Sequence, residues 1–306
     1  MRLAIASAVV LGTALIGSAH ADGDGLTDSL GPREIALGEA LRGGATGESA
    51  AILNPAGLPL SRDFVFEGGY GYRGSDSASL VALSACDTTA AIPGCFYYDY
   101  AGANPDLGGV SGHTSAQVGG AALAYPLTPR LFLGTSVKYF HFDSDVMGQP
   151  SSSGFNMDAG AMLRLTDIVN VGAAGYNLWG TSSVDFPRAA GGGVYTHPIP
   201  NLGLSFDSRW KLDGSSAARY GGGAELFLRS GNGQTGFPIR AGILHDSDPM
   251  VAATYVSGGL GIASLKYAID VGARHAISGA QHETLVIASM RFYGPRLPPP
   301  TSVAGD

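Results

Sequence analysis

The stretch Leu202-Gly203-Leu204-Ser205-Phe206-Asp207-Ser208-Arg209-Trp210-Lys211-Leu212 separates apolar from charged side chains by alternation. Successive side chains of an extended strand point to opposite faces. Leu204, Phe206 and Trp210 therefore share one face, together with Leu202 and Leu212. Asp207, Arg209 and Lys211 occupy the other face. The stretch predicts a β-strand with one apolar and one charged side.

Three other segments follow the same rule, with their charges confined to one face. These charges are Asp158 and Arg164 in residues 154–165, Arg219, Glu225 and Arg229 in residues 219–229, and Lys266, Asp270 and Arg274 in residues 265–274. A soluble sheet would turn its charged face to water, whereas a barrel in lipid must be apolar outside and can be polar inside. Alternation alone does not choose between these two arrangements.

Segment length favours the membrane barrel. Strands of globular sheets average about five or six residues, whereas a tilted strand that crosses a bilayer needs about 9 to 11. Twelve segments of suitable length lie at residues 64–73, 114–125, 131–143, 154–165, 168–179, 187–197, 202–212, 219–229, 236–246, 250–262, 265–274 and 281–293. We therefore predict an all-β fold, a transmembrane antiparallel β-barrel of about 12 strands, within a range of 12 to 14.

The charged faces of these strands give the candidate lumen lining. Its members are Lys138, Asp158, Arg164, Asp207, Arg209, Lys211, Arg219, Glu225, Arg229, Arg240, Lys266, Asp270, Arg274, Glu283 and Arg291. Charges in a narrow interior need partners. We expect pairs across neighbouring strands, or pairs with Glu39 and Glu48 of the preceding segment.

The longest connection, residues 74–113, contains both cysteines and a run of aromatic side chains. In an exported protein, Cys86 and Cys95 are expected to form a disulfide. Outer-membrane barrels alternate short periplasmic turns with longer outer loops, which places this connection outside the cell. Phe96, Tyr97, Tyr98 and Tyr100 are then candidate ligand contacts of an outer loop.

The two ends of the chain indicate export. Residues 1–21 have the charged start, apolar centre and Ala19-His20-Ala21 cleavage site of a secretory signal peptide. No later apolar run approaches the roughly 18 residues of a membrane helix. An even number of strands returns the carboxyl end of the barrel to the periplasm, so both termini are expected there. The Pro-rich tail, residues 294–306, would be an extended periplasmic appendage.

Composition and motifs give no sign of catalysis. The chain has 47 glycines among 306 residues, only 14% charged residues and a net charge of −7, with no basic patch for a nucleic acid. His141, Asp143 and Ser144 are too close in sequence to converge as a catalytic triad. The glycine runs 191–193 and 221–223 lack the Lys-Ser/Thr of a phosphate loop and are expected to relieve crowding or to open the wall. We predict no enzyme activity, no metal and no cofactor.

Residues 22–63 do not alternate like a strand, and within them lies ALGEALRGGATGESAAILNPAGL, residues 36–58. This stretch resembles the amino-terminal signature of the FadL family of outer-membrane transporters for long-chain fatty acids and other hydrophobic molecules, which some secretion-associated barrels share. The resemblance implies that residues 22–63 form a hatch inside the barrel of residues 64–293, with the motif Asn54-Pro55-Ala56. Family members usually have fourteen strands, and a hairpin within residues 80–100 would restore that number.

The resemblance also implies a function. We expect passive transport of hydrophobic molecules such as long-chain fatty acids across the bacterial outer membrane, with outer-membrane lipid and the hydrophobic ligand as partners. Cargo would be captured near the aromatic run and released past the hatch. The alternative is a barrel that does not transport, but docks secreted proteins or serves as a structural component of a secretion or envelope system.

Overall fold

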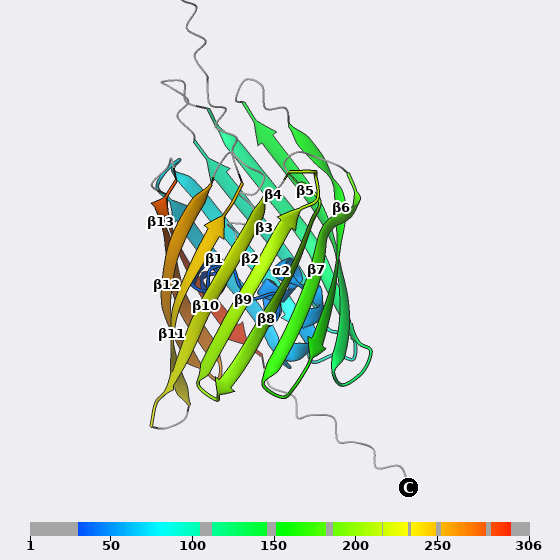
Figure 1. The fold of residues 1–306 in the computed structure, drawn as a ribbon, viewed down its shortest axis with the longest axis vertical. Coiled ribbons are helices and arrows are strands. Elements are labelled where there is room, and N and C mark those ends of the chain that lie inside the picture. Colours follow the sequence, from blue (N-terminus) through cyan, green and yellow to red (C-terminus); the bar gives the residue numbers. More distant parts are fainter. Residues whose placement is uncertain are drawn as a thin grey trace, which may run out of the picture.

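The computed structural model describes residues 30–104, 112–145, 151–181, 186–215, 217–231, 234–248, 252–279 and 283–294. The predicted signal peptide, residues 22–29 of the predicted hatch and residues 295–306 of the tail lie outside this part of the chain. Strands β1 to β14 close into one antiparallel barrel, in which β14 pairs with β1 (Figure 1). The strands are Phe64–Arg73, Ala78–Asp87, Gly94–Ala103, Thr114–Pro126, Leu131–Ser144, Ser152–Arg164, Val169–Gly180, Ala189–Ile199, Leu202–Lys211, Ala218–Arg229, Thr235–Asp246, Ala253–Ser264, Tyr267–Ser278 and Thr284–Tyr293.

The prediction of about twelve strands is corrected to fourteen. The segment expected to be one long outer loop contains the hairpin of β2 and β3, whose residues pair from Ser79 with Gly102 to Asp87 with Gly94. Both strands have a small apolar or polar residue at many positions, and each has a single acidic residue. The charge alternation that identifies β9 is therefore nearly absent from them.

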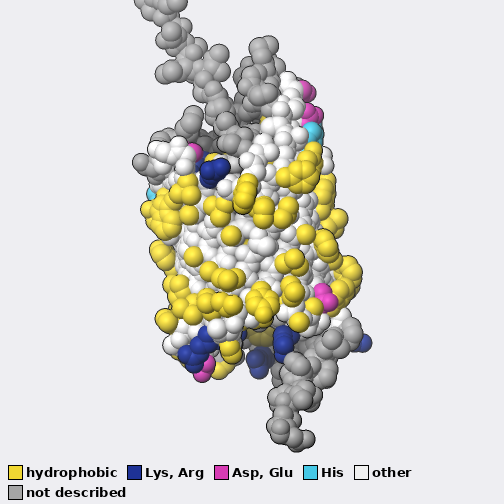
Figure 2. Space-filling view, turned by 90° about the vertical axis from the view of Figure 1, so that its right-hand side faces the viewer, with side chains coloured by type: hydrophobic (Ala, Val, Ile, Leu, Met, Phe, Trp, Pro, Cys, Tyr) yellow, Lys and Arg dark blue, Asp and Glu magenta, His cyan; other side chains and the backbone are white. Residues whose placement is uncertain are grey.

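The exterior of the barrel is apolar. On β9, Phe206 is 61% exposed and Trp210 is 43% exposed, whereas Asp207 between them is 1% exposed. Hydrophobic side chains cover the face of the wall shown in Figure 2, and Lys and Arg side chains gather mainly at its rims. A soluble sheet would have the opposite arrangement. The exterior suits a barrel surrounded by lipid.

The amino-terminal segment, residues 30–60, lies inside the barrel (Figure 1). It contains helix α1 (Pro32–Ala36), helix α2 (Gly47–Leu53) and the 3-10 helix η2 (Pro55–Leu60). None of the helices in the described ranges has the length and apolar character needed to cross a membrane. Helix α1 contacts β11 to β14, α2 contacts β2 to β4, and η2 contacts β4 to β7. The segment thus meets most of the inner circumference of the wall.

Candidate functional site

The amino-terminal segment rests directly on the backbone of the wall. A β-carbon placed on Gly172 of β7 would lie 2.0 Å from the carbonyl oxygen of Arg42, and one on Gly221 of β10 would lie 2.0 Å from that of Gly38. Side chains at these positions would prevent the contact. We call the wall glycines of this kind the glycine seat: Gly134, Gly160, Gly172, Gly221, Gly223, Gly242, Gly259 and Gly272. Two of them belong to the run 221–223, so here the run provides close packing against the segment.

Asn54 links the segment to itself and to the wall. It is fully buried. Its Nδ2 donates hydrogen bonds to the carbonyl oxygens of Arg42, at 2.9 Å, and Ala161 of β6, at 3.1 Å. Its Oδ1 accepts from the backbone N–H of Ala56 at 3.2 Å, which caps η2. Pro55 occupies the first position of η2, where a missing N–H costs little.

Ion pairs fasten the segment to strands β9, β10 and β13. Arg33 binds both carboxylate oxygens of Glu225 at 3.1 Å. Arg42 Nη1 lies 3.1 Å from Asp207 Oδ2, and Arg42 Nε donates to the Tyr176 hydroxyl at 2.6 Å. Arg274 Nη1 donates to Glu39 Oε1 at 2.9 Å. Burial alone would lower the pKa of Arg42, but the attraction of Tyr176 and Asp207 outweighs it and the pKa is raised, so this guanidinium stays charged.

The wall charges also pair with one another. Glu225, Arg240, Asp270, Arg291 and Glu67 form a chain of contacts from β10 to β1. Arg240 bridges Glu225 at 2.6 Å and Asp270 at 2.5 Å. Arg291 contacts Asp270 and lies 3.7 Å from Glu67. Elsewhere Lys138 pairs with Asp158 at 2.7 Å and Arg274 with Glu283 at 2.7 Å. These residues line the lumen but are held in structural pairs.

Other predicted lumen residues differ in position. Arg209 lies over the Tyr176 ring, with 5.2 Å from its guanidinium carbon to the ring centre. Arg164 lies in the same way over Phe132, at 5.7 Å. Arg229 and Lys266 are exposed, the first at the end of β10 and the second in the turn between β12 and β13. Their assignment to the lumen is wrong. The alternation of charged and apolar residues extends along the sequence past the part of each strand that encloses the lumen, so these two side chains lie at its rim.

A small recess lies where β9 ends and β10 begins, at the end of the barrel opposite to the start of β1. Its lining is Arg209, Lys211, Ala217, Ala218, Arg219 and Asp246. Lys211 pairs with Asp248 at 2.9 Å and Arg219 with Asp246 at 2.6 Å. The recess therefore combines two alanines with three cations and one carboxylate, so its lining is mainly cationic.

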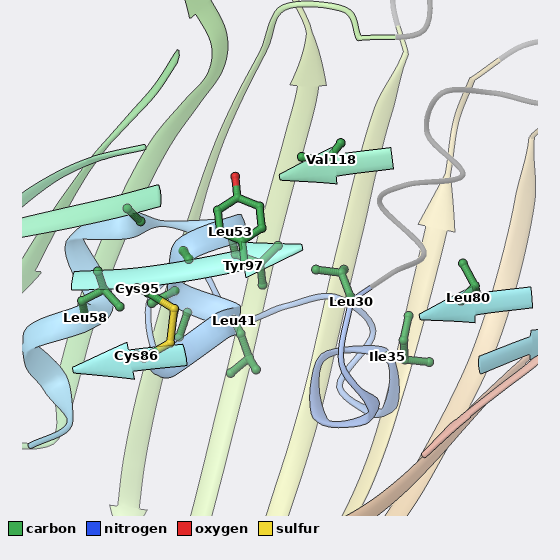
Figure 3. Packing of buried hydrophobic residues seen from close by; sticks show 14 of the residues in the cluster. Leu30, Ile35, Leu41, Leu53, Leu58, Leu80, Cys86, Cys95, Tyr97 and Val118 are labelled. Atoms are coloured by element: carbon green, nitrogen blue, oxygen red, sulfur yellow. A yellow bond between two sulfur atoms is a disulfide. The ribbon is translucent and has the colours of Figure 1, made fainter. Parts of the chain in front are cut away.

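The aromatic run is placed in β3, so its assignment to an outer loop is wrong. Phe96 and Tyr98 point outward and are 71% and 39% exposed, whereas Tyr97 points inward and is 6% exposed. Tyr97 belongs to the hydrophobic cluster that includes Leu53 of α2 (Figure 3). Of this run, Tyr97 has the clearest contact with the amino-terminal segment.

The predicted disulfide is present in a different setting. Cys86 of β2 and Cys95 of β3 oppose each other in the strand register and are joined by a disulfide. They lie near the turn between β2 and β3, at the end of the barrel where β1 begins, and not in a loop at the opposite end. Within the described ranges there is no group of three or more His, Cys, Asp or Glu side chains suited to a metal ion.

Comparison with known proteins identifies the architecture. No family model matches the chain, and no curated protein matches it in sequence. Solved structures do match. The CymD monoaromatic hydrocarbon channel aligns with a TM-score of 0.67 and 14% identity over 86% of this chain and 97% of its own. The Pseudomonas putida toluene transporter TodX aligns with a TM-score of 0.65 and 13% identity over 86% and 97%.

A third match is a FadL homologue of Pseudomonas aeruginosa, with a TM-score of 0.64 and 11% identity over 85% of this chain and 97% of its own. The chain has a FadL-type fold. At these identities the likeness concerns the fold alone, and the FadL-type architecture is shared along nearly the whole length of each neighbour. These three neighbours are named as channels, transporters or their homologues, and none is named as an enzyme.

Proposed function

We propose that this protein is an outer-membrane channel for the passive transport of hydrophobic molecules such as long-chain fatty acids. The observation that carries the proposal is a lipid-compatible barrel whose lumen is occupied by its own amino-terminal segment, seated on wall glycines. A wide open lumen would suit hydrophilic solutes. A lumen that is occupied by a segment of the chain suits cargo that displaces this segment or passes around it. We call residues 30–60 the hatch in this functional sense.

The nature of the cargo is supported by two features. The neighbours of the same fold include a monoaromatic hydrocarbon channel and a toluene transporter. The recess lined by Arg209, Lys211 and Arg219 adds a cationic surface at the mouth. A carboxylate head attached to an apolar tail would use both the cations and the apolar environment. We therefore propose a fatty acid in preference to a neutral hydrocarbon.

A lateral exit for the cargo would need an irregularity in the wall. The pairing of β6 with β7 shifts register, because Met157 faces Trp179 whereas Ala159 faces Gly175. Residues 176–178 thus oppose Asp158 alone, and Asn177 has a φ of 53°. Bulges bend a strand and interrupt its ladder. We propose this place, and not the glycine run 221–223, as the point where hydrophobic cargo leaves toward the bilayer.

Uptake measurements test the proposal. Cells that lack the gene are compared with cells that express it, with radiolabelled oleate in one arm and radiolabelled toluene in the other. We expect faster oleate uptake with the gene, and a reduction of that uptake in Arg209→Ala/Lys211→Ala. Equal oleate uptake in cells that contain the folded barrel would contradict the proposal. Faster uptake of toluene alone would contradict the choice of a fatty acid.

The proposed orientation has its own test. With both termini in the periplasm, a protease added to intact cells should not remove an epitope tag fused to Asp306. The same protease should remove the tag after the outer membrane is permeabilised. A tag that is cleaved on intact cells would contradict this orientation.

A further inference from the structure

The hatch meets the two sides of the barrel in different ways. The glycine seat extends over β5 to β7 and β10 to β13. In β1 to β4, by contrast, a β-carbon on any described glycine would meet only wall atoms. On this side the hatch is in contact through side chains, because α2 packs on β2, β3 and β4. Backbone contact therefore fixes one side of the hatch, and side-chain chemistry decides the other.

Part of that side-chain contact is hydrophobic. Leu53 of α2, Leu80 of β2, Tyr97 of β3 and Val118 of β4 belong to one buried cluster (Figure 3). Such packing is independent of pH. It holds α2 against the wall at every pH and does not make this contact respond to pH.

The remainder of the contact is acidic. Glu34 of α1, Asp99 of β3 and Glu67 of β1 each lie within electrostatic reach of Glu48 of α2, and we call these four residues the acidic seam. Glu34, Glu48 and Asp99 are 3%, 5% and 3% exposed. Glu48 Oε1 and Asp99 Oδ1 accept no hydrogen bond, although both atoms are buried. A buried carboxylate without a partner is far more costly than the same carboxyl group in its protonated, neutral form.

No cation neutralises most of the seam. Among the described residues, Glu34, Glu48 and Asp99 take part in no ion pair, and Glu67 lies 3.7 Å from Arg291. Arg33 is within electrostatic reach of Glu34, but its guanidinium is paired with Glu225. Arg291 also contacts Asp270, which holds it on the wall. Two serines donate to the seam, Ser49 to Glu34 and Ser289 of β14 to Glu67. The other neutral groups that face it are Ser84 of β2, Tyr97 of β3 and Tyr293 of β14. Helix η2 and the part of β4 that contacts α2 add no ionisable group.

We propose that protons on the acidic seam hold α2 against β2 and β3, so that this side of the hatch loosens as the pH rises while the side on the glycine seat stays docked. The proposal goes beyond transport, because it concerns the hatch alone and applies to any cargo. The two halves of the hatch would thus respond differently to the same change of pH.

The direction of the effect follows from the state of Glu48. Burial raises its pKa well above the ordinary value, and the charges of Glu67, Asp99 and Glu34 raise it further. The docked state thus binds a proton that the undocked state releases. Its stability is greatest below about pH 4.5, where an exposed glutamate is also protonated, and falls as the pH rises from there toward the raised pKa. The Arg33, Arg42 and Glu39 pairs on the other side have no such proton to lose.

Hydrogen exchange of the full-length protein in detergent micelles, without ligand, tests the proposal. Protection factors are corrected for intrinsic exchange and compared at about pH 5 and about pH 8. We expect protection of residues 47–53 to fall by about tenfold or more at the higher pH, and that of residues 36–42 to stay within about twofold. In Glu48→Gln, where residue 48 cannot ionise, the protection of residues 47–53 should depend on pH much less than in the wild type.

Glu39→Gln is the matched control, since it removes a carboxylate of the same segment that lies in an ion pair with Arg274. It should lower protection near residue 39 at both pH values and leave the pH response of α2 unchanged. Asp99→Asn, expected to weaken the response, serves as the second variant if Glu48→Gln does not fold. Wild-type protection of residues 47–53 that is flat with pH would overturn the proposal, as would an unchanged response in the folded Glu48→Gln variant. Neither result depends on whether oleate is transported.

Discussion

Gly172 of β7 faces the carbonyl oxygen of Arg42 so closely that a β-carbon on the glycine would lie 2.0 Å from that oxygen. The same carbonyl accepts a hydrogen bond from Asn54 Nδ2 at 2.9 Å, and the side chain of Arg42 pairs with Asp207. One residue of the hatch is thus fixed through its backbone and its side chain by two different strands. The hatch is built into the wall and does not merely fill the space that the wall encloses.

Gly172→Ala should displace the hatch without unfolding the barrel, because the added methyl group meets backbone that cannot turn aside. We expect hydrogen-exchange protection of residues 38–46 to fall by about tenfold or more, which corresponds to more than about 1.4 kcal/mol. Gly119→Ala is the control, since its β-carbon would lie 3.8 Å from Tyr98 Cδ2, an ordinary contact. Equal protection in the two variants would show that the glycine seat does not position the hatch.

Asn54→Ala should loosen the hatch motif. The substitution removes two donated hydrogen bonds and the cap of η2. At about 1 kcal/mol for each bond, the loss of hatch stability should be about 2 to 4 kcal/mol. Urea titration of the protein in lipid vesicles, followed by protease sensitivity of residues 47–60, measures it. Asn104→Ala, an exposed position, should change stability by less than about 0.5 kcal/mol. A similar shift in both variants would contradict a special role for Asn54.

The barrel can be predicted from the sequence because, in several strands, charged side chains alternate with apolar ones and so mark the two faces. In β9, Asp207 and Arg209 point inward between Phe206 and Trp210, and both the strand and its two faces follow from the order of residues. In β2, Ala82, Ser84 and Ala85 differ too little for their faces to be told apart. The aromatic run of β3 is predicted as part of a binding loop for the same reason. Asp99 is its one charged residue, and a single charge does not show an alternation of charged and apolar side chains.

The contacts of the hatch could not be predicted in detail because they join distant residues. Arg33 and Glu225 are 192 positions apart, and Arg42 and Asp207 are 165 apart. The pairing of Glu39 with wall cations agrees with the expectation from charge, whereas Glu48 has no cation. The register of each strand sets the height of its inward charges along the barrel, and therefore which residue of the hatch each charge meets. These registers are determined only when all strands are paired in the closed barrel.

Arg42→Met should be strongly destabilising because it leaves the buried carboxylate of Asp207 without its cation. Both side chains of this pair are less than 10% exposed, at 6% and 2%. We expect a loss of about 3 to 5 kcal/mol, of which Arg42→Met/Asp207→Asn should regain a part. A double-mutant cycle on unfolding in vesicles measures the coupling. Lys211→Met, at the more exposed pair with Asp248, should cost less than about 1 kcal/mol. Strict additivity of the two substitutions would contradict the assigned pair.

Leu260→Arg should weaken the barrel in a bilayer, because Leu260 is 66% exposed in the middle of β12 and would bring a charge into the hydrocarbon. The expected cost is about 2 to 4 kcal/mol at the bilayer centre and near zero at the interface. Leu212→Arg is the matched control, since Leu212 is 55% exposed just beyond the end of β9. Folding titrations of both variants in phosphatidylcholine vesicles compare the two depths. If Leu260→Arg were as stable as Leu212→Arg, the apolar exterior would not be in contact with lipid, and the wall would instead be covered by another protein.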